Sequence, residues 1–139
     1  MIQQGQCTIF KKNCLSGLEN FAVGTTQVYK IALYTAFADL SYATLAYTSD
    51  NEIVGTGYTA TGQVLTVLPP ASASQTAYVS FANAVWDPAS FTARGALIYN
   101  STTGAAVAVL DFGNDKTFNT TFTVTFPADT STDAVIRFS

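Results

Sequence analysis

Residues 95–110 read GALIYNSTTGAAVAVL, in which two apolar runs stand on either side of a cluster of turn-forming residues. The turn formers occupy 100–104 and include Gly104. Two apolar runs joined by a short segment that contains glycine predict a β-hairpin. The second run, 105–110, has no polar alternation, which is typical of a strand covered on both faces. The sequence therefore predicts an antiparallel pair whose second strand is buried on both sides.

The chain before this hairpin alternates between strand patterns and turn formers. The Ala- and Leu-rich stretch 36–46 is expected to be mostly loop, and turn formers accumulate over 47–62. A period of two residues, together with β-branched and aromatic side chains, indicates strands on both sides of these stretches. We expect these strands at 27–34, 63–68, 77–81 and 91–94.

The chain after the hairpin contains two more predicted strands. Residues 111–116 collect turn formers and are expected to reverse the chain into a strand at 118–126. Pro127 ends that strand, because proline lacks the N–H that a sheet needs. A closing strand is expected at 134–138.

The alternation of these strands predicts which side chains form the core. In the strand 27–34 the core face carries Tyr29, Ile31 and Leu33. Trp86, which precedes Asp87 and Pro88, is expected either in the core or in an interface between subunits. In the last third of the chain, the side chains expected in the core are Phe118, Phe122, Phe126 and Phe138.

One helix is expected at 8–18, near the start of the chain. Thr8 is a plausible N-cap, and Phe10, Cys14 and Leu18 recur at the spacing of one helix face. Cys7 and Cys14 are seven residues apart, which in a helix is about 10 Å and too far for a disulfide. We therefore expect two free, half-buried thiols.

These elements together predict the fold class. The patterns amount to about seven to nine short strands with no helical interludes, which favours a sandwich, a jelly roll or a small barrel. A length of 139 residues is typical of one domain. We expect an all-β, antiparallel β-sandwich or jelly-roll-like single domain over residues 1–139, with one short N-terminal helix and strands from about 27 to 138.

The composition excludes several classes of function. The chain has no histidine, so it cannot use imidazole in catalysis, in metal binding or as a proton shuttle. Charged residues make up only 11%, with six Lys and Arg and a net charge of −3, so binding to nucleic acid or to an anionic membrane is not expected. Ser and Thr, 31 of 139 residues, supply most of the polar surface instead.

The start of the chain has neither the basic residues nor the apolar stretch of a signal peptide. No apolar run approaches the ~20 residues of a transmembrane helix. We therefore expect no secretion signal and no membrane partner.

Two short motifs resemble sites of known chemistry but lack the context that such sites need. Asp111-Phe112-Gly113 spells the metal-binding tripeptide of protein kinases, yet no catalytic loop accompanies it. Gly55-Thr56-Gly57 lacks the third glycine and the helix of a phosphate-binding loop. We expect the first to be coincidental and the glycines of the second to serve a turn.

The remaining acidic residues suggest no site either. Asp111 and Asp115 lie four residues apart, as do Asp129 and Asp133, without the alternating oxygen ligands of a calcium loop. We expect solvated carboxylates in turns, no catalytic residue, no metal site and no cofactor. The weakest alternative is a glycan hydrolase that relies on carboxylates such as Glu52 or Asp111.

Several strings in the chain resemble a family of small structural proteins of tailed bacteriophages. The resemblance covers most of the chain from Cys7 onward. It implies a virion component of the head-decoration or tail-fibre kind and brings no catalytic residues with it. The strings are KIALYT at 30–35, NEIVGTGYTA at 51–60, ARGALIYN at 93–100, AVAVLDFG at 106–113, and the ending from Phe126-Pro127 to Ile136-Arg137.

The sequence as a whole favours a virion structural protein. Scarce charge, many hydroxyls and many short strands suit a subunit that packs against neighbours, as capsid decoration or cement or in a tail or fibre. The expected partners are other virion proteins and further copies of this chain, with assembly in the host cytoplasm. The alternative is a host-surface carbohydrate or receptor-binding module that uses exposed aromatic side chains such as Trp86 and Tyr58.

Overall fold

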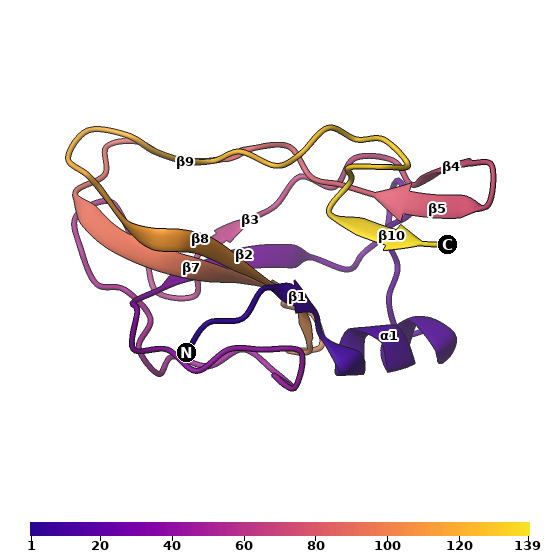
Figure 1. Cartoon of the computed structure of the whole chain (residues 1–139), viewed down its shortest axis with the longest axis horizontal. Helices are drawn as coiled ribbons and strands as arrows, with labels where there is room; N and C mark the ends of the chain where they lie inside the picture. The colour runs from indigo at the N-terminus through magenta and orange to yellow at the C-terminus, as the bar shows by residue number, and fades with distance from the viewer.

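The computed structural model describes all 139 residues and contains one helix and ten strands (Figure 1). The helix α1 spans Thr8–Leu15. The strands are β1 (Gly5–Gln6), β2 (Tyr29–Tyr34), β3 (Gln63–Val64), β4 (Ala71–Ala73), β5 (Thr76–Val79), β6 (Ala84–Trp86), β7 (Phe91–Asn100), β8 (Ala106–Phe118), β9 (Phe122–Val124) and β10 (Ile136–Phe138). The prediction of an all-β fold with one short N-terminal helix is confirmed.

The largest sheet has the strand order β1-β8-β7-β2-β3, and every pair in it is antiparallel. The predicted hairpin is the pair β7 and β8. On its other edge β7 pairs with β2 over the full length of that strand. The sheet is thus built on residues 91–118, and β2 completes its centre.

The centre of this sheet is covered on both faces. The sheet β6-β9 lies along one side of it, and the N-terminal segment with the loop 36–46 lies along the other, whereas the sheet β10-β5-β4 lies beyond one end of the main sheet, near α1 (Figure 1). In β2, Ile31, Ala32, Leu33 and Tyr34 are all inaccessible to solvent, so the expectation of one buried face was too narrow. Burial of a side chain such as Leu33 contributes about 2 kcal/mol to folding.

Aromatic rings join the main sheet to the smaller one above it. Trp86 of β6 and Phe122 of β9 both contact Phe91 of β7, with ring centroids 6.4 Å and 5.2 Å away. Trp86 is only 5% exposed. Of the two positions expected for Trp86, the structure therefore shows the core.

The prediction of a turn at 111–116 is wrong, because these residues continue strand β8. Ala93 pairs with Lys116 and Gly95 with Asp111, so Arg94 alone stands opposite residues 112–115. Gly113 adopts a positive φ of 87°, which glycine tolerates best. Residues 112–115 therefore form a large bulge in β8 rather than a reversal of the chain. Across it, the predicted strand 91–94 and the first hairpin run form one strand.

The predicted strand 118–126 is also shorter than expected. Phe118 ends β8 and a turn follows it, so only Phe122–Val124 form a strand in this region. Phe122 and Phe126 are buried, as predicted, whereas Phe118 and Phe138 are each 44% exposed. The prediction of Phe118 and Phe138 as core residues is wrong because each lies near the end of its strand. Phe118 is the last residue of β8, far from the part of β8 that pairs with β1, and Phe138 ends the edge strand β10.

The helix is shorter than predicted, and its N-cap is Cys7, which makes no side-chain capping bond. Phe10 is buried and Cys14 is half-buried, but Leu18 lies beyond the end of the helix and is exposed. Gly17, at a φ of +72°, turns the chain after the helix.

Three further strand predictions need adjustment. The strand expected at 63–68 is reduced to β3, and the strand expected at 134–138 is reduced to β10. The strand expected at 77–81 is β5, and its partner β4 was not predicted because Ala71–Ala73 contains no β-branched or aromatic residue.

Candidate functional site

The Glu52 carboxylate lies at the centre of a group of tyrosines. Tyr47 donates its hydroxyl to Oε2 of Glu52 at 2.5 Å, and Tyr58 donates to Oε1 at 2.5 Å. The backbone N–H of Thr61 also donates to Oε1, at 2.8 Å. The Tyr99 hydroxyl donates to the carbonyl of Thr61 at 2.6 Å, and its ring stacks on Tyr47. Both oxygens of Glu52 are therefore occupied by groups of the chain itself.

Burial and the nearby carboxylate act together on the tyrosines of this Glu52 cluster. Burial raises the pKa of Tyr58 and of Tyr47 well above the ordinary value, and the hydrogen bond to Glu52 raises it further. Burial also raises the pKa of Tyr34, whose hydroxyl donates to the Thr48 carbonyl. The hydroxyls stay protonated and act as donors. This arrangement holds segment 47–61 against the sheet, with both oxygens of Glu52 engaged in bonds within the chain.

A second carboxylate, Glu19, lies between α1 and β2 and is used differently. Oε2 of Glu19 accepts hydrogen bonds from the Tyr29 hydroxyl at 2.7 Å and from Nδ2 of Asn100 at 3.2 Å. The amide oxygen of Gln27 accepts from the same two donors, at 3.2 Å and 3.1 Å. Oε1 of Glu19 is buried and has no hydrogen-bond partner in the chain. Such an oxygen calls for a physical explanation.

The acidic residues singled out in the sequence do not come together. Asp111 is paired with Arg94, at 3.2 Å, and also accepts the N–H of Gly113. It therefore stabilises the bulge in β8. Asp115 is exposed, as is Asp129. The structure gathers no group of three or more Cys, Asp and Glu side chains that could hold a metal ion.

The other motifs of the sequence have structural roles. Gly57 has a φ of +88°, and a Cβ there would lie 1.9 Å from the carbonyl oxygen of Pro88. A Cβ on Gly55 would lie 2.7 Å from Cβ of Phe91. These two glycines allow the segment to approach β7 closely, which agrees with the expected turn role.

The two aromatic side chains suggested as a sugar platform are not available for stacking. Trp86 is buried, and its ring packs against Tyr58 and Phe91. Tyr58 is half-buried, with its hydroxyl on Glu52. The aromatic side chains that do face solvent include Phe37, which is 85% exposed, and Tyr42.

Four large, exposed apolar side chains lie on the loop 36–46 and at the start of the chain. Backbone hydrogen bonds join the two segments, since the Leu40 N–H donates to the Met1 carbonyl and the Gln3 N–H donates to the Leu40 carbonyl. Burial of Leu40 fixes the loop to the core. We call the exposed side chains on these joined segments the apolar loop surface; they are Met1, Phe37, Tyr42 and Leu45.

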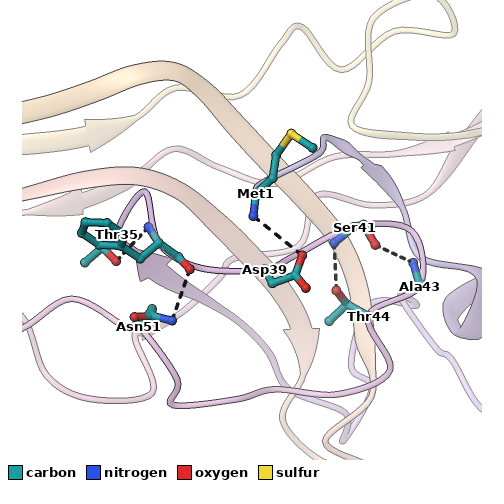
Figure 2. A network of polar contacts seen from close by, with 8 residues as sticks. Met1, Thr35, Asp39, Ser41, Ala43, Thr44 and Asn51 are labelled. Atoms are coloured by element: carbon teal, nitrogen blue, oxygen red, sulfur yellow. Dashed lines mark hydrogen bonds and ion pairs between the residues drawn. The ribbon is translucent and has the colours of Figure 1, made fainter.

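Short-range contacts hold the backbone of this loop in place (Figure 2). The Ser41 N–H donates to the Thr44 hydroxyl, and the Ala43 N–H donates to the Ser41 hydroxyl. The Met1 amino group lies 3.7 Å from Asp39. Sequence reasoning placed this stretch in a loop but missed its exposed aromatic side chains. Their only signal was the presence of large apolar residues in a segment with no strand period.

Both cysteines are free thiols, as predicted, and Cys14 is half-buried. Cys7 is fully buried, so the prediction that it is half-buried is wrong. Burial raises the pKa of each to about 11, and the nearby Glu19 carboxylate contributes to the rise at Cys14. The helix of the structure lacks the length and apolar character needed to cross a membrane. Comparisons with protein-family models, curated proteins and solved structures find no match to this chain.

Proposed function

We propose that this chain is a structural protein of a tailed-bacteriophage particle. It packs on the outside of the particle, either as a decoration or cement subunit of the capsid or as a subunit associated with the tail or fibre. The observation that carries the proposal is the apolar loop surface, where Phe37 and Tyr42 project from a backbone held by its own hydrogen bonds. The sequence strings described above point to the same class of protein.

The proposed mechanism is adhesion, without catalysis or a cofactor. Covering large apolar side chains removes apolar surface from water, which favours association, and few charged groups nearby must lose their hydration. A loop that is already ordered also pays a smaller entropy cost on binding. A subunit that binds only the assembled particle stabilises that particle by mass action.

Sheet edges offer a second means of contact. Strand β4 lies at the edge of its sheet with Ala71–Ala73 exposed, and β3 forms an edge of the main sheet. Unpaired N–H and C=O groups on such edges can pair with another chain. This supports contacts between copies of the chain on the particle. A carbohydrate-binding role is not part of the proposal, because the ring of Trp86 is occupied inside the protein.

The experiment is to count copies of the chain in purified particles by quantitative mass spectrometry against a labelled standard. Hundreds of copies per particle support capsid decoration, and about a dozen or fewer support a tail or fibre position. Sedimentation of the purified chain over a range of concentrations gives its self-association. Trace amounts in particles, together with a monomer at high concentration, contradict the proposal.

A further inference from the structure

A small hollow lies where β4, β5 and β10 meet the segment that follows α1. Its volume is about 170 Å³. Most of the side chains around it are apolar, and three of them are aromatic. The lining includes Phe21, Tyr78, Ile136 and Phe138, together with Cys14 and the Glu19 carboxylate.

The Glu19 carboxylate gives this hollow a negative charge that the chain does not neutralise. The side-chain ion pair of the structure is Arg94 with Asp111, and the other ion pair joins the chain's amino group to Asp39. Neither involves Glu19. Its Oε2 accepts from two neutral groups, whereas its buried Oε1 has no partner. A partly buried carboxylate whose charge no cation of the chain offsets is costly, so a ligand that brings positive charge close to it would be stabilised.

The aromatic side chains that line the hollow also favour a positively charged ligand. Phe21 stacks on Tyr29 at 4.3 Å, and Phe10 packs against both Phe21 and Phe138 at 5.9 Å and 6.2 Å. These contacts hold two of the three aromatic walls in place. The face of an aromatic ring attracts a cation, and several rings around one cation form a cage.

The number of acceptors decides which cation fits. A bare ammonium carries three N–H donors, but the unpartnered oxygen of Glu19 is closed to solvent and most of the lining is apolar, so the hollow would leave those donors unpaired. Methyl groups on the nitrogen remove donors and fill apolar space. A calcium ion would need six or more oxygen ligands. We therefore propose that this hollow binds an alkylammonium group, with its charge beside Glu19 and its methyl groups against Phe21, Tyr78 and Phe138.

The neighbouring hollow limits the rest of the ligand. It shares Cys14 and Phe138 with the first hollow and is also lined by Lys11 and Arg137. These two cations repel a second positive charge, so the remainder of the ligand is neutral or anionic. Choline has this composition, and so does the trimethyllysine side chain of a partner protein. The inference is independent of the virion role.

Titration with choline, followed by NMR chemical shifts of the labelled chain, tests the proposal. We expect saturable shifts confined to residues around the hollow. The uncharged isostere 3,3-dimethylbutan-1-ol should bind at least about tenfold more weakly, since it keeps the shape and loses the charge. Equal binding of the two compounds, or shifts that do not saturate, would overturn the proposal.

Variants locate the site and separate binding from folding. Glu19→Gln should weaken choline binding by about tenfold, and Phe138→Leu by a few fold, because one loses charge and the other an aromatic wall. The matched controls are Asp133→Asn, an exposed carboxylate, and Phe118→Leu, whose ring is exposed to the same 44% as Phe138. If Glu19→Gln disturbs the fold, the choline affinities of Phe138→Leu and Phe118→Leu still show whether the ligand binds in the hollow. Equal effects in the two would overturn the assignment.

A trimethyllysine peptide distinguishes the two sources of the alkylammonium group. Tighter binding of the peptide than of choline assigns the hollow to a partner's side chain. Tighter binding of choline assigns it to a small molecule. Competition between the two probes is required in either case, and its absence would contradict a shared site.

Discussion

Glu52 and Glu19 are two half-buried carboxylates that each accept a tyrosine hydroxyl, and they differ in what remains free. Glu52 receives three donors on its two oxygens, all from residues 47–61. Glu19 receives two donors on one oxygen, and its other oxygen is buried without a partner. The carboxylate of Glu52 forms hydrogen bonds that hold segment 47–61 in place. The carboxylate of Glu19 keeps a negative charge that no cation of the chain offsets.

The largest loss of stability is expected from a substitution at Gly62, which is next to the Glu52 cluster in the chain and has a backbone conformation that favours glycine. Gly62 has a φ of +80°, and a Cβ there would lie 1.8 Å from the carbonyl oxygen of Ile31. Its neighbour Thr61 bonds both Glu52 and Tyr99. Gly62→Ala should therefore lower the free energy of unfolding by about 4 kcal/mol, from clash and left-handed strain together. Urea denaturation measures the loss.

Gly104 provides the matched control for that substitution. It has a similar φ of +83°, but nothing lies within 4 Å of a Cβ placed on it. Gly104→Ala should cost only about 1 kcal/mol, the strain of the left-handed conformation. Equal losses for the two variants would show that close approach at Gly62 is not what holds the cluster together.

The next effect compares the two carboxylates directly. In Glu52→Gln one oxygen becomes an NH₂ group, so at least one buried donor loses its acceptor, at a cost of about 2–3 kcal/mol. In Glu19→Gln the amide oxygen can replace Oε2, and the NH₂ group takes the place of the unpartnered Oε1. The cost there should stay below about 1 kcal/mol. Chemical denaturation of both variants at pH 7 tests this order, and a larger loss for Glu19→Gln would reverse the comparison.

A single hydroxyl gives a smaller effect. The Tyr58 hydroxyl donates to Glu52 and accepts the N–H of Leu33 at 3.0 Å. Tyr58→Phe removes both bonds and should cost about 2 kcal/mol. Tyr42→Phe, on an exposed side chain, should leave the thermal unfolding midpoint unchanged. If the two variants unfold alike, the Glu52 cluster contributes nothing through Tyr58.

The titration of buried tyrosines and thiols is expected to have the smallest effect on stability near neutral pH. The folded-state pKa of Tyr58, Tyr47 and Tyr29 is raised above the unfolded value of about 10, chiefly by burial. A raised pKa means that the associated stability is present below the unfolded pKa and is lost as the pH rises above it. The thiols of Cys7 and Cys14, with a pKa of about 11, add a loss that begins near pH 9.

Unfolding measured in reductant should therefore give a stability that falls from about pH 9 and more steeply above pH 10. Tyr58→Phe should flatten the steep part, because it removes one of the groups that titrate. An unchanged slope in this variant would contradict the assignment of the loss to the tyrosines.

Local patterns predicted the central hairpin well, because both of its strands and their turn lie within residues 91–118. The same kind of reasoning failed at 111–116. Glycine and Asp-rich segments serve bulges as well as turns, and the distinction depends on pairing with Phe91–Gly95. The core assignments of Phe118 and Phe138 failed for a similar reason. Both have strand periodicity, but each lies near a strand end, where aromatic neighbours cover only part of the ring.

The two carboxylate sites differ in how far the sequence could reveal them. Tyr47 and Tyr58 lie within six residues of Glu52, so a local signal existed. Asn100 lies 81 residues from Glu19, and only the fold brings them together. The apolar loop surface was equally hidden, because an apolar residue such as Phe37 in a loop is ordinarily assigned to the core.

The most direct test of the account is cosedimentation of the purified chain with particles that lack it. The wild-type chain should bind until a fixed number of sites is filled. The double variant Phe37→Ser and Leu45→Ser should bind at least about tenfold more weakly, since exposed anchors at an interface carry its affinity. Leu15→Ser, at an exposed position outside the apolar loop surface, is the control and should bind as wild type does. Failure of the wild-type chain to bind in excess, or equal binding of the double variant, would contradict the account.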